Sequence, residues 1–184
     1  MSTETIIKVE LATSEALYKG AMAIRKQVFV KEQRIPESKE FDGNDFCAAH
    51  VVAYVQKNNR RLPIGTMRIR FFSDFVKFER MAVIRNFRKT NVAEDIMQYG
   101  LKYVAEKGYR QVYGMCKQEL LPRWQQCGYH EIPGAERIEQ NGMVLIPISL
   151  DLKENPRDKM TSHPSLLMAL KGIGKEIRKS ESRR

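Results

Sequence analysis

A cluster of basic residues lies directly before an expected helix in the middle of the chain. Arg85, Arg88 and Lys89 occupy the polar loop over residues 85–91, and an apolar pattern with helical spacing begins at Val92. The first N–H groups of a helix lack intrahelical partners and carry the positive end of its dipole. A basic loop at this point is therefore suited to a phosphate or pyrophosphate group. The same residues also fit an ordinary capped helix after a solvated loop, so two interpretations stay open.

The elements on either side of this loop follow two different periods. Residues 76–83 alternate as a strand does, and residues 92–107 recur at helical spacing until Gly108 supplies a stop. Asn91 and Glu94, three residues apart, have the form of a capping box. The sequence thus predicts a strand, a basic loop and a capped helix.

Charged residues also gather in two earlier segments. The polar segment over residues 33–45 holds Glu37, Glu40, Asp42 and Asp45. Such carboxylates could receive an amine, but each one taken singly fits a solvated surface loop better. In the expected strand over residues 64–71, Arg68 and Arg70 share one face, which could point to an anionic ligand; solvent exposure is the default expectation.

The remaining periods predict a mixed α/β domain with helices packed against a sheet. The expected strands span residues 5–11, 48–55, 64–71, 76–83, 111–116 and 143–150, with one further short strand over 129–132, and the expected helices span 14–32, 92–107 and 118–126. Ser14 is suited to cap the first helix, which should end near Glu32. Pro147 indicates that the last strand is an edge strand or carries a bulge.

Composition narrows the class of protein. The 184 residues are 42% hydrophobic and 29% charged, which fits one globular domain with an appended tail. No apolar run approaches a membrane span and the first residues do not resemble a signal peptide, so we expect a cytoplasmic protein without a transmembrane segment. The three cysteines and three histidines form no metal-ligand spacing, so no metal is expected.

The net charge of +10 favours acidic partners. Nucleotide phosphates, an acidic carrier protein and nucleic acid all meet that description. Because no basic motif interleaved with aromatic residues is present, specific binding of nucleic acid is not expected.

Several stretches resemble the GCN5-related N-acetyltransferases. The family's coenzyme A pyrophosphate loop has the pattern Gln/Arg-x-x-Gly-x-Gly/Ala, which Arg88 and Ala93 match. Asn91 replaces a glycine of that pattern, and asparagine tolerates the left-handed backbone that glycine adopts. Residues 25–33, 40–50 and 65–68 resemble further motifs of the family, so the resemblance covers about residues 5–150.

The resemblance implies the acyl-CoA N-acyltransferase fold, a mixed and mostly antiparallel sheet flanked by helices, over residues 1–150. It also implies direct transfer of an acetyl or other acyl group from acyl-CoA to the primary amine of a small acceptor, without a metal. In the family the donor's pantetheine lies between two splayed strands. The residues implied to contact the donor are Met81, Val83, Arg88, Lys89, Thr90, Asn91, Val92, Ala93 and Trp124.

Transfer to an amine needs a general base, and departure of the thiolate is helped by an acid. The resemblance makes Glu79 the leading base, directly or through water; the alternative is a strand carboxylate paired with an arginine. Trp124 stands where the family has the tyrosine that acts as general acid, and an indole does not donate a proton as a phenol does. Tyr113, Cys116 or water would then take that role, while Trp124 packs against the donor or the core.

A second resemblance is to the acyl-homoserine-lactone and N-acyl amino acid synthases, which share the fold and use acyl carrier protein. The matching positions are Arg25, Phe29, Asp42, Asp45, Arg68 and Arg80, and all of these except Arg80 are assigned to substrate binding. Lys77 departs from that pattern, which has a glutamate there, and no tryptophan lies near Ile35. The retained Arg88-x-x-Asn91-x-Ala93 favours a coenzyme A donor. A third alternative is a non-catalytic acyl-CoA-binding module, because Asn91 and Trp124 both depart from the family pattern.

Residues 151–184 form a basic carboxyl-terminal extension of different character. Apolar residues recur at helical spacing over residues 165–178, with lysines between them. This amphipathic helix could dock on the domain, lie at an interface or act as the arm of a homodimer. Docking is the default expectation.

Overall fold

The computed structural model describes residues 6–57, 60–140 and 142–153. Within these residues the strands form one sheet in the order β1-β2-β3-β4-β5-β8-β6, with β7 also paired to β8. All neighbours are antiparallel except β4 and β5, which are parallel. The predicted mixed, mostly antiparallel sheet is confirmed.

The elements follow the predicted order, with several short additions. The strands are β1 (Ile6–Leu11), β2 (Ala48–Lys57), β3 (Arg60–Phe71), β4 (Phe75–Val83), β5 (Gln111–Lys117), β6 (His130–Glu131), β7 (Ile138–Gln140) and β8 (Met143–Asp151). The α-helices are α1 (Glu15–Arg25), α2 (Glu37–Glu40), α3 (Val92–Glu106) and α4 (Leu121–Gln126). The other helical segments are η1 (Lys26–Glu32, π-helical), η2 (Asn44–Cys47), η3 (Arg85–Phe87) and η4 (Gln118–Leu120).

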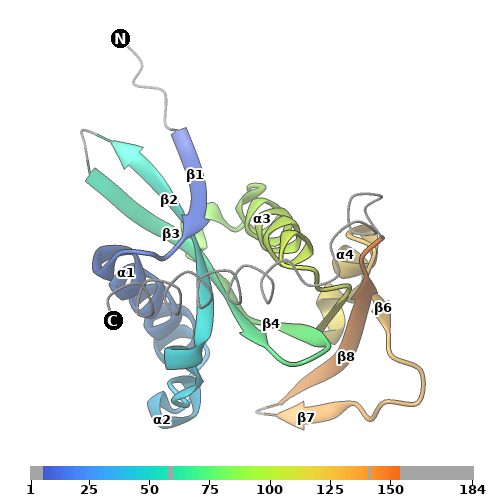
Figure 1. Cartoon of the computed structure of the whole chain (residues 1–184). Coiled ribbons are helices and arrows are strands. Elements are labelled where there is room, and N and C mark those ends of the chain that lie inside the picture. Colours follow the sequence, from blue (N-terminus) through green and yellow to red (C-terminus); the bar gives the residue numbers. More distant parts are fainter. Residues whose placement is uncertain (1–5, 58–59, 141, 154–184) are drawn as a thin grey trace, which may run out of the picture.

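Helices α1 and α3 lie on opposite faces of the sheet (Figure 1). Strand alternation sends Val51 and Met67 into the larger core cluster, which includes the buried residues of α3. Val52 and Tyr54 point the other way and pack with residues of α1. The sheet is therefore covered on both sides at β2, β3 and β4.

Helix α1 begins as its sequence predicts. The Ser14 hydroxyl accepts a hydrogen bond from the Leu17 N–H at 3.4 Å, so the predicted cap is confirmed. Helical structure continues to Glu32, as expected, but its last seven residues form a π-helix that the sequence did not indicate. A π-helical segment displaces side chains from the ordinary helical register and is frequent at functional sites.

Helix α3 begins differently from the prediction. The side chain of Asn91 makes no capping hydrogen bond, so the predicted capping box is wrong. Asn91 also has φ −80° and ψ 9°, outside the left-handed region expected for a glycine replacement. At the other end Gly108 has φ 91° and follows the helix, so the predicted stop is confirmed.

The last strand is not at an edge, contrary to the expectation from Pro147. Strand β8 lies between β5 and the short strands β6 and β7, and its register with β5 is unbroken. The Pro147 carbonyl accepts from the Ile132 N–H at 3.1 Å, so the Pro147 nitrogen faces the same side, past the end of β6. The proline therefore interrupts no hydrogen bond to β5.

Two further predictions concern the carboxyl-terminal extension and membrane-spanning helices. The predicted amphipathic helix over residues 165–178 lies outside the described residues. Among the residues that are described, no helix has both the length and the apolar character to cross a membrane.

Candidate active site

Strands β4 and β5 separate part of the way along their length. They pair from Phe75–Gln111 to Phe78–Gly114, and no pairing between them follows in the described chain. Strand β4 continues to Val83, while β5 stays paired with β8 up to Lys117. The backbone of residues 79–83 therefore borders a gap between two strands, as the resemblance implied.

A bulge in β4 lies at the start of this gap. Ala82 pairs with Thr66 and Glu79 pairs with Arg68, so β4 has one residue more than β3 over this stretch. Arg80 and Met81 of β4 lie opposite the single residue Met67 of β3. Arg80 has φ 56°, which is rare for a residue with a side chain. The bulge redirects the β4 backbone at the point where it leaves β5.

The side chain of Arg80 is held by the segment before β2. Its Nε lies 2.9 Å from Glu40 Oε2, and one Nη lies 3.2 Å from the Lys39 carbonyl and 3.4 Å from Asp42 Oδ2. Glu40 is only 1% exposed, and this burial raises the pKa of its carboxyl group despite the neighbouring arginines. The short helix α2 thus anchors the β4 bulge.

Two buried arginines connect this segment to α1 and β3. Arg25 is fully buried and donates to Glu40 Oε1 at 2.6 Å, to the Glu40 carbonyl at 2.8 Å and to the Asp45 carboxylate. Arg68 is also fully buried, and its two Nη atoms donate to Asp42 at 2.7 and 2.9 Å, with a further bond of 2.9 Å to Asp45. These hydrogen bonds lower the pKa of Asp42. They also lower the pKa of Asp45, where they outweigh the opposing effect of burial.

The expectation of a solvated loop and strand face is therefore wrong for Glu40, Asp45 and Arg68. It holds for Glu37, which is exposed and pairs with Lys26 at 2.7 Å. Because Arg25 and Arg68 have no exposed surface, the structure favours a role in holding the loop over direct contact with a substrate. Of the predicted substrate residues, only Asp42 is exposed. Phe29 is half-buried and packs against Ile24, Val28 and Ala82.

Glu79, the predicted base, lies one residue past the last β4–β5 pair. Its Oε1 accepts from Arg68 Nε at 3.0 Å and lies 2.8 Å from one Arg68 Nη, and its Oε2 lies 3.4 Å from Lys77 Nζ. The alternative of a strand carboxylate paired with an arginine is therefore what the structure shows. Its position at the gap keeps the role of base as a prediction.

The basic loop lies at the far end of β4, against the first turn of α3. Arg88 Nε donates to the Val83 carbonyl at 2.9 Å, and its guanidinium pairs with Glu32 at the end of η1. Thr90 Oγ1 donates to the Phe87 carbonyl at 2.7 Å. Asn91 does not cap α3, and the Val92 N–H has only a long bond of 3.5 Å to the Thr90 hydroxyl. The N–H groups of the first turn, together with exposed Lys89, therefore fit a pyrophosphate.

Gly65 explains how this helix start comes close to the sheet. A Cβ atom on Gly65 would lie 2.9 Å from Val92 Cγ1 and 2.7 Å from Ile96 Cδ1. Only glycine therefore lets the first turn of α3 pack this tightly on β3. The predicted donor residue Val92 thus stands at a close contact between helix and strand.

The candidates for the acid lie in different surroundings. Trp124 packs edge-to-face on Tyr129, with ring centroids 5.2 Å apart, which agrees with the core-packing alternative. Burial raises the pKa of the Cys116 thiol to about 11 and also raises that of the Tyr129 hydroxyl. Tyr113 is half-buried and lies opposite Lys77, before the strands separate. Contact of any of these groups with a donor stays a prediction.

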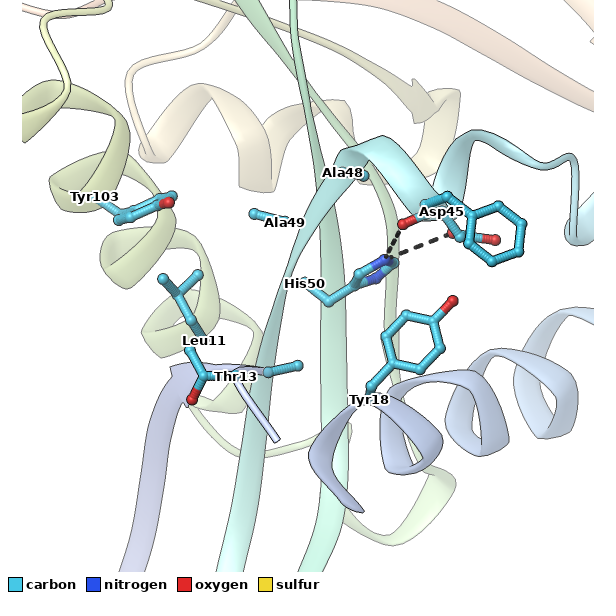
Figure 2. A pocket seen from close by; sticks show the side chains of 10 residues that line it. Leu11, Thr13, Tyr18, Asp45, Ala48, Ala49, His50 and Tyr103 are labelled. Carbon is cyan, nitrogen blue, oxygen red and sulfur yellow. Dashed lines mark hydrogen bonds and ion pairs between the residues drawn. The ribbon is translucent and has the colours of Figure 1, made fainter. Parts of the chain in front are cut away.

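The sequence did not indicate the surface hollow of about 460 Å³ at the end of β1 (Figure 2). His50 lines it, with its Nε2 3.3 Å from the Asp45 carbonyl oxygen and its ring edge-to-face with Tyr18. Burial lowers the pKa of His50, so the ring is uncharged near neutral pH. Through Asp45 this hollow adjoins the buried arginines.

No cluster of three or more histidine, cysteine, aspartate or glutamate side chains in the described part of the chain could hold a metal ion. No protein-family model matches the sequence. Individual proteins do match. A Bacillus subtilis protein assigned as an acetyltransferase is 35% identical over 105 residues, which cover 55% of this chain and 69% of that protein.

Solved structures agree with the sequence match. A Lactobacillus plantarum protein assigned as an N-acetyltransferase superposes with a TM-score of 0.72 at 23% identity, over 80% of this chain and 99% of that one. BjaI, described as a coenzyme A-dependent acyl-homoserine lactone synthase, superposes with a TM-score of 0.62 at 17% identity, over 82% and 85% of the two chains. These two similarities establish the fold. Together with the Bacillus subtilis relative, they show that the chain is an acyltransferase of the GCN5-related N-acetyltransferase family.

Proposed function

We propose that this acetyltransferase moves an acyl group from acyl-CoA, acetyl-CoA among them, directly to the primary amine of a small acceptor. The observation that carries the proposal is the gap between β4 and β5, which begins at Glu79 and ends at the basic loop before α3. An extended thioester donor fits along such a gap, because β4 offers backbone groups at one end and the loop offers cations at the other.

The donor's pyrophosphate is assigned to Arg88, Lys89, Thr90 and the N–H groups of residues 91–93. Its pantetheine is assigned to the backbone of Met81 and Val83, which no longer pairs with β5 in the described chain. Trp124, on α4, is the proposed contact on the other side. Binding of the pyrophosphate competes with Glu32 for the Arg88 guanidinium.

The reaction class is nucleophilic substitution at the thioester carbonyl carbon. A carbon–nitrogen bond forms and the carbon–sulfur bond breaks, while one proton leaves the amine and one is taken up by the departing sulfur. Glu79 is the proposed acceptor of the amine proton, directly or through water. Backbone N–H groups beside the Arg80 bulge are the proposed donors to the oxyanion.

Use of acyl carrier protein as donor, with an amino acid or a lactone precursor as acceptor, is the second candidate. The observation that favours it is the arginine–carboxylate group of Arg25, Asp42, Asp45 and Arg68, whose sequence positions match that branch. Lys77 and the retained loop of residues 88–93 favour coenzyme A instead. BjaI itself is described as a coenzyme A-dependent lactone synthase, so similarity to that branch is compatible with a coenzyme A donor.

Thermal unfolding with separate donors tests the proposal. Coenzyme A, acetyl-CoA, a long-chain acyl-CoA and acyl carrier protein are each titrated against the full chain. A ligand at 100 times its dissociation constant stabilises the native state by about 2.7 kcal/mol, which raises the melting temperature visibly. A shift with acetyl-CoA, followed by release of free thiol when amines are added, supports acyl-CoA transfer. A shift with carrier protein alone supports the second candidate, and no shift with any donor refutes both.

A further inference from the structure

Two cations face each other on the side of the sheet away from α3. Arg70 of β3 and Lys77 of β4 are direct partners in the antiparallel ladder. Like charges at directly opposite positions repel each other and destabilise a sheet. Their side chains are 27% and 35% exposed, so solvent only partly screens the repulsion. A pair of this kind needs an anion.

Glu79 is the only carboxylate within ion-pair distance of either cation in the described chain. Its Oε1 lies 3.8 Å from Arg70 Nε, and its Oε2 lies 3.4 Å from Lys77 Nζ. Arg68 Nε already donates to Oε1 at 3.0 Å and one Arg68 Nη lies 2.8 Å from it, so a third cation shares this carboxylate. Glu79 alone therefore leaves Arg70 and Lys77 incompletely paired.

The charges deeper in the site do not supply the missing anion, because they balance among themselves. The inner group consists of three cations and three anions, Arg25, Arg68 and Arg80 with Glu40, Asp42 and Asp45. Outside this group one carboxylate, Glu79, faces two cations, Arg70 and Lys77. One positive charge is left over at the surface, beside the predicted base.

Three aromatic rings lie beside this excess charge. Phe72 stacks on Phe75 with ring centroids 4.6 Å apart, and Phe75 meets Tyr113 edge-to-face at 5.0 Å. The Arg70 guanidinium lies over the Phe72 ring at 5.1 Å, which keeps its fork oriented. The three rings are half-buried, so they offer apolar surface next to the two cations.

The position of these residues connects them to the gap. Lys77 pairs with Tyr113, and Phe78 and Gly114 form the next and last pair before β4 leaves β5. Glu79 follows directly. A molecule held by Arg70 and Lys77 would therefore extend its other end toward the opening where the thioester is proposed to lie.

We propose that Arg70, Phe72, Phe75, Lys77 and Tyr113, here called the carboxylate patch, bind the carboxylate and the apolar portion of the acceptor. The acceptor is then an amine that also carries a carboxylate, such as an amino acid with an apolar side chain. A carboxylate suits the planar Arg70 fork and supplies the missing charge. This inference rests on the proposed acyl transfer, and it adds the class of the acceptor.

A matched pair of acceptors tests it. Phenylalanine and 2-phenylethylamine differ only by the carboxylate, and acyl transfer to each is measured with the donor that stabilises the protein. We expect kcat/KM to favour phenylalanine at least 10-fold. Lys77→Met and Arg70→Met should each reduce that preference about 10-fold, mainly through a higher KM for phenylalanine. Equal use of the two amines by the unaltered protein would overturn the proposal.

Arg61→Met is the control for loss of an arginine from the same strand. Arg61 also pairs with a glutamate, Glu10 at 2.6 Å, and also lies over an aromatic ring, Tyr54 at 5.0 Å. Arg61→Met should leave the preference for phenylalanine over 2-phenylethylamine unchanged. Lys77→Met should not lower the melting temperature, because it removes one of two opposed like charges. An unchanged preference in both Lys77→Met and Arg70→Met contradicts the patch.

Calorimetric binding separates this inference from the proposed function. If donors bind but no amine is acylated, the transfer proposal fails, and the patch is then judged by binding alone. Phenylalanine should still bind the donor complex more tightly than 2-phenylethylamine, and Lys77→Met should abolish the difference. Absence of that difference overturns the patch independently of catalysis.

Discussion

Replacement of Arg80 by glycine or by alanine tests whether the β4 bulge has the left-handed backbone of the structure. Both changes remove the guanidinium and its contacts to Glu40 and Asp42, so they differ mainly in backbone preference. Alanine at φ 56° costs about 1–2 kcal/mol, whereas glycine adopts this region freely. Alanine also restricts the unfolded chain more than glycine does, which stabilises the alanine variant by about 0.4–1 kcal/mol. Arg80→Gly should therefore be more stable than Arg80→Ala by about 1 kcal/mol.

The assay is urea unfolding of the two variants. With a slope of roughly 1–3 kcal/mol per molar urea, the expected difference is about 0.3–1 M in the midpoint. Arg61, an exposed β3 residue without a positive φ, is the matched control. There the order should reverse, with alanine about 0.5–1 kcal/mol more stable than glycine. Equal midpoints at residue 80, or the same order at both sites, would refute the left-handed bulge.

Three further changes test other parts of the site. Glu32→Gln removes the competitor for Arg88, so coenzyme A should bind about 2- to 5-fold more tightly in calorimetry, as expected for loss of a partly exposed ion pair. His50 has a lowered pKa, so the unfolded chain binds its proton near pH 6.5 while the folded chain does not, and stability must fall as the pH drops below about 7. Urea unfolding should show this fall, by up to about 1.4 kcal/mol per pH unit, and His50→Gln should lose it whereas His130→Gln should not. Gly100→Ala should lower the free energy of unfolding by about 1–3 kcal/mol although alanine favours helices, since its Cβ would lie 3.1 and 3.2 Å from the buried Phe78 ring and 2.5 Å from Cε of the buried Met67.

The order of the helices and strands could be predicted from the sequence, because each hydrophobic period marks the buried face of one element. Alternation over residues 64–71 and 76–83 and the helical spacing after Val92 depend on which side chains meet the core, and the structure has those elements. The loop before α3 was found in the same way, as a change from one period to the other. The stop at Gly108 and the cap at Ser14 rest on local backbone chemistry, and both are present.

The features that failed prediction depend on contacts between distant parts of the chain. Glu40 and Asp45 were expected to be solvated because charged residues usually are. Their burial requires Arg25, which lies 15 and 20 residues earlier in the chain. The left-handed bulge at Arg80 likewise depends on a carboxylate 40 residues away in sequence. No pattern of neighbouring residues in the sequence indicates such pairings.

Division of the charges into an inner balanced group and an outer unbalanced one separates structural residues from specificity residues. Removal of one member of a buried pair leaves an unpaired charge and costs about 3–5 kcal/mol, so Arg25→Ala should mainly unfold the protein. Loss of activity in that variant would then say nothing about the substrate. Arg70 and Lys77 differ, because they are partly exposed and already repel each other. Their replacement removes a contact to Glu79 but leaves the inner group intact. Because both test amines would use the same base, a change in acceptor preference there can be attributed to contact with the acceptor.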